Sequence, residues 1–260
     1  MPTTYTHDAF GRKVYKNLQG DLQELIRRHI QLYRIGLHGP DILFYYGLRK
    51  NYVNQTGVRL HGEVAYPFFE QGIELVRKNQ DDALLAYLLG FACHFMLDST
   101  CHPYIYHIED QVSHTIIEKE MDRRMMKKDG LDPLTYFPAK GIIPSRENAV
   151  IIQQMFPDIS VELIEKALKG MRRLTGLMVY EKEDIYRKKM LFLKLIGLKK
   201  TFGEHFMTGH ADGNCDAWLA VLDDFFACAL EETPKILERL YWCAKTDLEL
   251  PERFRRNYQD

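Results

Sequence analysis

The sequence predicts an all-α protein that forms a single compact domain of many helices. Hydrophobic residues recur at intervals of three and four along most of the chain, as they do on one face of a helix. No alternation of apolar and polar residues continues long enough to indicate a strand. The chain has 260 residues, of which 46% are hydrophobic and 12% aromatic, enough to fill one large core.

Six segments show the helical periodicity most clearly: residues 21–33, 61–76, 82–97, 113–126, 161–174 and 217–240. The polar junction at 79–81 is expected to cap the helix that begins at residue 82. Residues 129–145 carry three prolines and two glycines, which predicts a long loop. We therefore divide the single domain, 1–260, into a motif-bearing part at 1–128, a loop at 129–145 and C-terminal helices at 146–250.

Charge and cysteine usage limit the classes of partner and compartment. Lys and Arg number 35 and Asp and Glu 36, so the net charge of -1 gives no reason to expect nucleic acid as a partner. The first residues, MPTTYTHDAF, lack the pattern of a signal peptide, and the five cysteines show no disulfide spacing. Both observations predict a cytoplasmic protein with reduced thiols.

Two apolar segments bear on membrane contact. The longest apolar run, residues 83–97, is shorter than the roughly 20 residues that span a bilayer, so no transmembrane segment is predicted. Residues 187–200 (RKKMLFLKLIGLKK) have basic ends around an apolar centre. Such a segment is either a core helix with solvated ends or a helix that makes a peripheral membrane contact. We favour the core helix, because the basic residues do not occupy one clean face.

The candidate functional residues are densest from position 94 onwards. His94, Asp98 and His102 are four residues apart, so on a helix each lies about 40° further round and about 6 Å further along than the one before. They would form one polar stripe on an otherwise apolar helix. Pro103 disfavours helical geometry at the residue before it, so the helix is expected to end near His102.

A second step of four residues follows at His114 and Glu118. Imidazole and carboxylate groups at this spacing are natural zinc ligands, although iron or manganese also accept them. His102 with this pair makes three ligands, and Asp98 could bridge two ions. The alternative is a satisfied core histidine and a surface ion pair. We favour a metal site, because burying so many polar groups without a partner is costly.

The segments HFMLDSTCHP (94–103) and HTIIE (114–118) resemble the zinc-dependent phospholipase C family of bacteria, whose fold is shared with zinc nucleases that cut single strands. The order of motifs in that family is His-x3-Asp, a His-Pro and then His-x3-Glu. The resemblance continues upstream at Thr6-His7, at Gly39-Pro40-Asp41 and at His61, and it covers roughly residues 1–128.

The resemblance implies a set of metal ligands and one catalytic group. His61, His94 and Asp98 would hold one zinc ion, and His102, His114 and Glu118 another. Asp98 would bridge to a further zinc ion held by His7 and the N-terminal amine, for which Pro2, or Met1 if retained, is the candidate. Asp41 would act as the general base or orient the attacking water. The family pattern thus implies two or three zinc ions.

Two functions follow as hypotheses. The first is a zinc-dependent hydrolase that cleaves a phosphodiester, with a phospholipid as one candidate substrate. A phosphatase-like or nuclease-like enzyme acting on a soluble substrate is a variant of the same idea. The second is a zinc-stabilised helical module that has lost catalysis. The altered N-terminus motivates it, because the secreted enzymes begin with Trp and this chain begins with Met1-Pro2.

Overall fold

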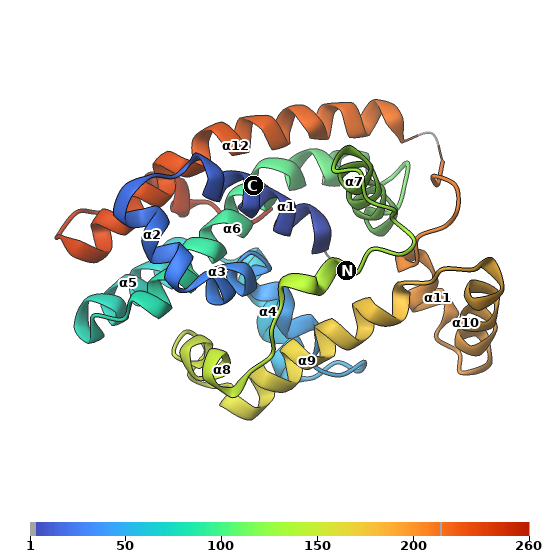
Figure 1. The fold of residues 1–260 in the computed structure, drawn as a ribbon, viewed down its shortest axis with the longest axis horizontal. Coiled ribbons are helices and arrows are strands. Elements are labelled where there is room, and N and C mark those ends of the chain that lie inside the picture. Colours follow the sequence, from blue (N-terminus) through green and yellow to red (C-terminus); the bar gives the residue numbers. More distant parts are fainter. Residues whose placement is uncertain (1–3, 214, 260) are drawn as a thin grey trace.

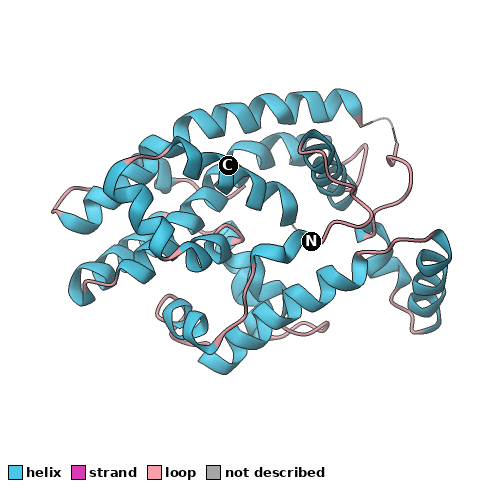
Figure 2. Cartoon of the chain, in the orientation of Figure 1, coloured by secondary structure: helices cyan, strands magenta, loops and turns pink. Residues whose placement is uncertain are grey.

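The computed structural model describes residues 4–213 and 215–259. These residues form α-helices and short 3-10 helices, and no strand occurs among them (Figure 2). The prediction of an all-α fold is confirmed. The α-helices are α1 (Thr4–Asn17), α2 (Gly20–Arg28), α3 (Ile30–Gly36), α4 (Tyr52–Gly62), α5 (Tyr66–Asn79), α6 (Asp82–Ile108), α7 (His114–Lys128), α8 (Arg146–Gln153), α9 (Val161–Met178), α10 (Glu183–Leu195), α11 (Lys199–Phe202) and α12 (Asp216–Lys245). The 3-10 helices are η1 (Gly39–Tyr45), η2 (Pro138–Gly141), η3 (Gly203–His205) and η4 (Glu252–Arg255).

The long helix α6 lies at the centre of the molecule, with α1, α3, α5 and α12 packed around it (Figure 1). Every residue from 84 to 99 is buried, and apart from the polar His94, Asp98 and Ser99 the segment is apolar on all sides of the helix. By length and composition α6 could cross a membrane. However, 94% of its most apolar window is buried inside the protein, as in the core helix of a helical domain.

Two glycines allow α3 and α6 to pack with their backbones in contact. A Cβ atom on Gly90 of α6 would overlap the carbonyl oxygen of Tyr33 and lie 3.0 Å from the Cα atom of Gly36. A Cβ atom on Gly36 would in turn overlap the carbonyl oxygen of Tyr87. This close approach sets the distance between α6 and the turn that follows α3, and that turn leads into η1.

Two predicted helices are each divided in the structure. The prediction of one helix over 21–33 is wrong, because His29 separates α2 from α3. The prediction of one helix over 61–76 is also wrong, because α4 ends at Gly62 and α5 begins at Tyr66. Pro67 explains the second break: it fits the first turn of α5, whereas inside a continuous helix it would remove a hydrogen bond.

The predicted end of the central helix near His102 is wrong as well. α6 continues through Pro103 to Ile108. The ring of Pro103 is on the exposed side of the helix, and Ile105 and Ile108 beyond it are buried. Burial of these two side chains favours continued helix over the loss of one backbone hydrogen bond.

Other predicted features are confirmed. Asp81 caps α6, with its side chain accepting a hydrogen bond from the Leu84 backbone N–H at 2.9 Å. Residues 129–145 form an irregular connection interrupted only by η2. One main hydrophobic core extends from Tyr5 to Tyr258, and a small separate cluster lies under α10. The five cysteines are unpaired.

Candidate metal centre

The eight predicted site residues come from five elements and meet beside α6. α1 carries His7, η1 carries Asp41, α4 carries His61, α6 carries His94, Asp98 and His102, and α7 carries His114 and Glu118. The spacing of four places the three residues of α6 on one side, where they face the other elements. All of the eight except His61 and His114 are buried, and those two are partly buried.

The N-terminal end of α1 is held in place by a carboxylate of α7. Asp122 accepts hydrogen bonds from the backbone N–H of Tyr5 at 3.1 Å and of Thr6 at 2.8 Å, and from the Thr6 hydroxyl at 2.7 Å. It therefore satisfies donors that the first turn of a helix leaves unpaired. Burial raises the pKa of Asp122 to about 6, although these hydrogen bonds oppose the shift. His7 follows directly and is thereby fixed against α6.

Asp98 is the central carboxylate of the site. Its Oδ1 atom lies 3.1 Å from His7 Nε2, and its Oδ2 atom lies 3.0 Å from His94 Nε2. His61 Nε2 and His102 Nδ1 each lie 3.9 Å from Oδ2. Burial alone would raise the pKa of Asp98, but the surrounding imidazoles outweigh it and hold that pKa well below its usual range. An ionised carboxylate between imidazoles is suited to bridging two cations.

The first group of potential ligands is His61, His94 and Asp98, whose donor atoms all lie within 4.8 Å of one another. His61 Nδ1 lies 2.8 Å from the carbonyl oxygen of Gly57, one turn earlier in α4. Because a carbonyl can only accept, this contact places the proton on Nδ1 and leaves Nε2 free to bind a metal.

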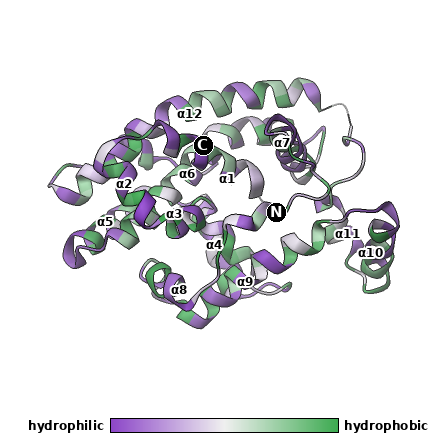
Figure 3. Ribbon diagram, in the orientation of Figure 1, coloured by the Kyte–Doolittle hydropathy of each residue, from purple (hydrophilic) through white to green (hydrophobic). Residues whose placement is uncertain are grey.

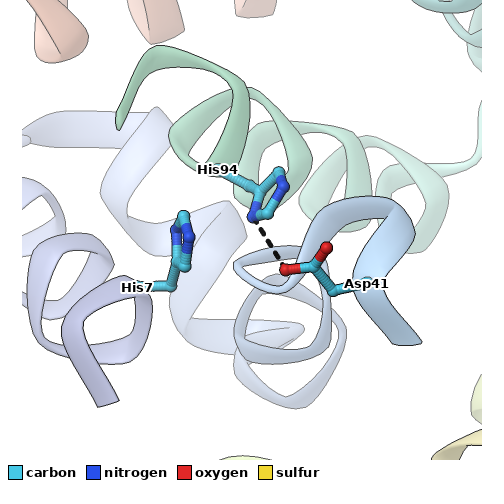
Figure 4. A group of neighbouring side chains, drawn as sticks. All are labelled: His7, Asp41 and His94. Atoms are coloured by element: carbon cyan, nitrogen blue, oxygen red, sulfur yellow. Dashed lines mark ion pairs between the residues drawn. The ribbon is translucent and has the colours of Figure 1, made fainter. Parts of the chain in front are cut away.

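The second group is His7, Asp41 and His94 (Figure 4). Figure 4 shows the three side chains converging from α1, η1 and α6, with His94 Nδ1 at 3.9 Å from Asp41 Oδ2. The rings of His7 and His94 are stacked with centroids 4.3 Å apart. Gly39 has a φ angle of 47°, and a Cβ atom there would overlap the ring of His94. Glycine is therefore needed to bring η1 and Asp41 this close to α6.

The position of Asp41 allows a role that the sequence does not suggest. Asp41 was expected to act on water, whereas the geometry also groups it with two potential ligands. The predicted amine ligand, Pro2 or Met1, lies outside the described residues.

The third group is His102, His114 and Glu118. Glu118 Oε1 lies 3.2 Å from His114 Nε2 and 3.7 Å from His102 Nε2. His102 Nδ1 contacts the carbonyl oxygen of Tyr258 at 3.0 Å, which leaves its Nε2 atom free. Burial alone would raise the pKa of Glu118, but hydrogen bonds with the two imidazoles lower it well below its usual range.

Several buried polar atoms of the site have no hydrogen-bond partner among the described residues. They are His7 Nδ1, both carboxylate oxygens of Asp41 and both ring nitrogens of His94. Asp41 Oδ1 does lie 3.1 Å from His61 Nε2, and His94 Nε2 lies 3.0 Å from Asp98 Oδ2, but these are close approaches between potential ligands without the geometry of a hydrogen bond. Leaving such atoms unpaired in the interior is costly, and a cation would satisfy them. The donor set of imidazole nitrogens and carboxylate oxygens, with backbone carbonyls fixing two of the rings, fits zinc.

A cavity of about 390 Å³ opens onto the site. Its lining combines potential ligands with the apolar side chains of Phe44, Val58 and Tyr106, and it also includes Gln259. Phe44 stacks on His61 at 5.3 Å, and the Tyr106 ring lies 5.6 Å from that of His102. The cavity thus combines a cation-binding floor with an apolar wall.

The apolar wall and the C-terminal contact are not among the residues that sequence reasoning selected. Tyr106 follows His102 by four residues, so the spacing rule places it on the same side of α6 once the helix continues past Pro103. The carbonyl of Tyr258 carries no signal in the sequence. His205 and His210 belong to none of the ligand groups found among the described residues.

A sequence model of the family described as zinc-dependent phospholipase C matches residues 6–175. The match includes all eight site residues and extends beyond the resemblance at 1–128 into α9. Searches of curated proteins and of solved structures found no match to this chain. Because the family model covers more than half of the sequence, the chain belongs to the zinc-dependent phospholipase C family.

Proposed function

We propose that this protein hydrolyses a phosphodiester in the cavity beside α6, using two or three zinc ions. The observation that supports this most directly is Asp98, an ionised buried carboxylate with four imidazoles around it. Membership of a zinc-dependent phospholipase family supports a metal-dependent hydrolase in general. The diester as substrate and the role of each residue are our proposal.

Each group of side chains has a distinct proposed task. His61, His94 and Asp98 hold one zinc ion. His102, His114 and Glu118 hold another, and His7 with Asp98 contributes to a further one. Bound zinc would polarise the phosphate oxygens and make water a stronger nucleophile. The carboxylate of Asp41 lines the cavity and is proposed to accept the proton of the attacking water.

The apolar part of the cavity lining supports a substrate with an apolar substituent. Phe44, Val58 and Tyr106 line the cavity without contributing a charge. Ile42, which directly follows the general base in sequence, is fully buried, so Phe44 supplies the aromatic surface next to His61. A diester whose second substituent is a lipid or another apolar group would use this wall, whereas a phosphomonoester would leave it without contact.

The first experiment compares substrates on the zinc-loaded protein. We expect hydrolysis of bis(p-nitrophenyl) phosphate to exceed that of p-nitrophenyl phosphate, and diacylglycerol to be released from phosphatidylcholine vesicles. Faster monoester hydrolysis would favour a phosphatase. No turnover of any phosphoester, with zinc bound and stability lost on chelation, would favour the non-catalytic zinc module.

Substitution Asp41→Asn tests the proposed base. We expect turnover to fall by roughly 10²- to 10⁴-fold with zinc content unchanged. Asp129→Asn is the control, because Asp129 accepts a hydrogen bond from the Tyr5 hydroxyl at 2.5 Å outside the cavity. If Asp41→Asn loses zinc together with turnover, Asp41 is a metal ligand and not the base.

We also propose that the protein works in the cytoplasm on substrates other than nucleic acid. Support for the compartment comes from five unpaired cysteines. Support against nucleic acid comes from the net charge of -1, which gives a polyanion no overall attraction.

A further inference from the structure

The helix pair α10 and α11 projects from one end of the molecule, beyond α9 (Figure 1). It does not join the main core. Its buried contacts are made by a small separate cluster of Tyr180, Met190 and Phe206. The pair is therefore an attached unit with its own packing, and it leaves much of its surface uncovered.

α10 is apolar on two opposite sides. Met190 and Leu193 face the small cluster. Leu191, Phe192 and Leu195 are exposed, at 57%, 61% and 76% of their full accessible area. At 100° per residue these three side chains point about 180° away from the packed side. Figure 3 shows hydrophobic and hydrophilic residues mixed along this outer helix. The prediction that residues 187–200 form a core helix is therefore wrong.

Basic residues lie near the exposed apolar side, although Arg187 and Lys188 pair with Glu183 at 3.7 Å and Asp184 at 3.5 Å in the first turn of α10. Residues 187–200 contain six Lys or Arg residues and no Asp or Glu. Lys189 is used internally, since its ammonium donates to the carbonyl oxygens of Leu177 at 2.7 Å and Val179 at 2.6 Å. Lys194, Lys199 and Lys200 are exposed and have no ion-pair partner among the described residues.

We propose that the α10–α11 pair docks onto the surface of an anionic lipid bilayer. Exposed leucine and phenylalanine side chains can enter the boundary between headgroups and acyl chains, and neighbouring lysines then meet the anionic headgroups. A second copy of this chain fits less well, because pairing two such surfaces would bring the basic residues of both copies together.

The proposed docking surface is connected to the helix that carries two of the potential zinc ligands. The segment after α11 returns to α7, where Glu204 accepts a hydrogen bond from the Ser113 hydroxyl at 3.0 Å. Further along, Arg123 donates to the carbonyl oxygen of Thr208 at 2.8 Å. Ser113 directly precedes His114. Docking would thus hold the metal centre near the lipid surface, although the inference itself does not depend on catalysis.

Co-sedimentation of the full, zinc-loaded chain with vesicles tests the proposal. We expect binding to vesicles of equal parts phosphatidylcholine and phosphatidylglycerol, weak binding to phosphatidylcholine alone, and release by salt. Lys199→Gln with Lys200→Gln should lower the partition coefficient about 25-fold, since each basic residue near an anionic surface contributes roughly a factor of five. Leu191→Ser with Phe192→Ser should abolish sedimentation.

Trp242→Ser is the matched control. Trp242 is 54% exposed in the last turn of α12. The C-terminal end of α12 lies at the opposite end of the molecule from α10 (Figure 1). Unchanged binding in both double variants, or equal binding to neutral and anionic vesicles, would overturn the proposal. A dimer in lipid-free solution that the Leu191/Phe192 variant dissociates would also overturn it, in favour of a second copy. Binding is measured without turnover, so its failure would leave the proposed hydrolase untouched.

Discussion

The contact between α3 and α6 yields the most specific prediction, through Gly90→Ala. The new methyl group would overlap the carbonyl oxygen of Tyr33 and lie 3.0 Å from Gly36 Cα. Both obstacles are backbone atoms, so no side-chain rotation can relieve the overlap and the helices must move apart. Overpacking of this kind costs up to about 3 kcal/mol, and the better helix propensity of Ala returns up to about 1 kcal/mol. We expect a net loss of about 2 kcal/mol of unfolding free energy.

Thermal unfolding measures this loss. For a chain of this size, about 2 kcal/mol corresponds to a Tm lower by roughly 4–8 °C. Zinc affinity should fall as well, because His94 lies one turn after Gly90 and η1, with Asp41, follows α3. Gly176→Ala is the control: its Cβ atom would lie 3.6 Å from Phe137 Cε2, an ordinary contact, so this variant should be neutral or slightly more stable. A Gly90→Ala protein as stable as the Gly176→Ala protein would refute the argument.

Four further predictions concern the metal centre and its supports. Asp98→Asn should retain helicity but lose every zinc ion except the one at the third ligand group, which elemental analysis can count. At pH 7, zinc binding to the metal-free protein should release a proton from His102, whose pKa is raised to about 9 because Asp98 and Glu118 outweigh its burial. An indicator dye would detect that proton, and an affinity that does not increase with pH would contradict the prediction. For Asp122 the folded-state pKa of about 6 exceeds the ordinary 3.8, so its contribution to stability is fully present below about pH 4 and is lost as the pH rises through 6. The Asp122→Asn variant should lack this decline in urea titrations between pH 4 and 7. Deleting residues 258–260 removes the carbonyl of Tyr258 from His102 and should weaken zinc binding at that group 10- to 100-fold, as competition with a chelator would show.

Local spacing was sufficient to predict part of the site. The steps of four that join His94, Asp98 and His102 require only a continuous helix, and the structure provides one. The step from His114 to Glu118 is equally local. The set of three and the pair could therefore each be grouped before any tertiary contact was known.

The remaining residues of the site could not be identified from local spacing. His7, Asp41 and His61 lie on separate helices, and no spacing rule connects segments that meet only after folding. They were identified by resemblance to a family, which records which segments meet. Tyr258 contributes a backbone carbonyl, and any residue could supply that group, so its side chain gives no indication.

The helix boundaries, too, depend partly on local sequence and partly on tertiary packing. Pro67 and Pro103 carry the same local signal, yet one begins a helix and the other lies inside one. The difference is tertiary: Ile105 and Ile108 beyond Pro103 have a core to enter. Local propensity could not distinguish these outcomes, because the packing partners lie elsewhere in the chain.

The contact between His102 and the carbonyl of Tyr258 joins residues 156 positions apart, and it has a consequence for biosynthesis. The chain emerges from the ribosome N-terminus first. All eight proposed site residues are made by position 118, while α12 and the segment that orients His102 are made later. The ring of His102 therefore acquires its partner only after Tyr258 has been made, long after the ligands themselves. Zinc taken up during synthesis would meet the third ligand group in a looser form than the one in the finished protein.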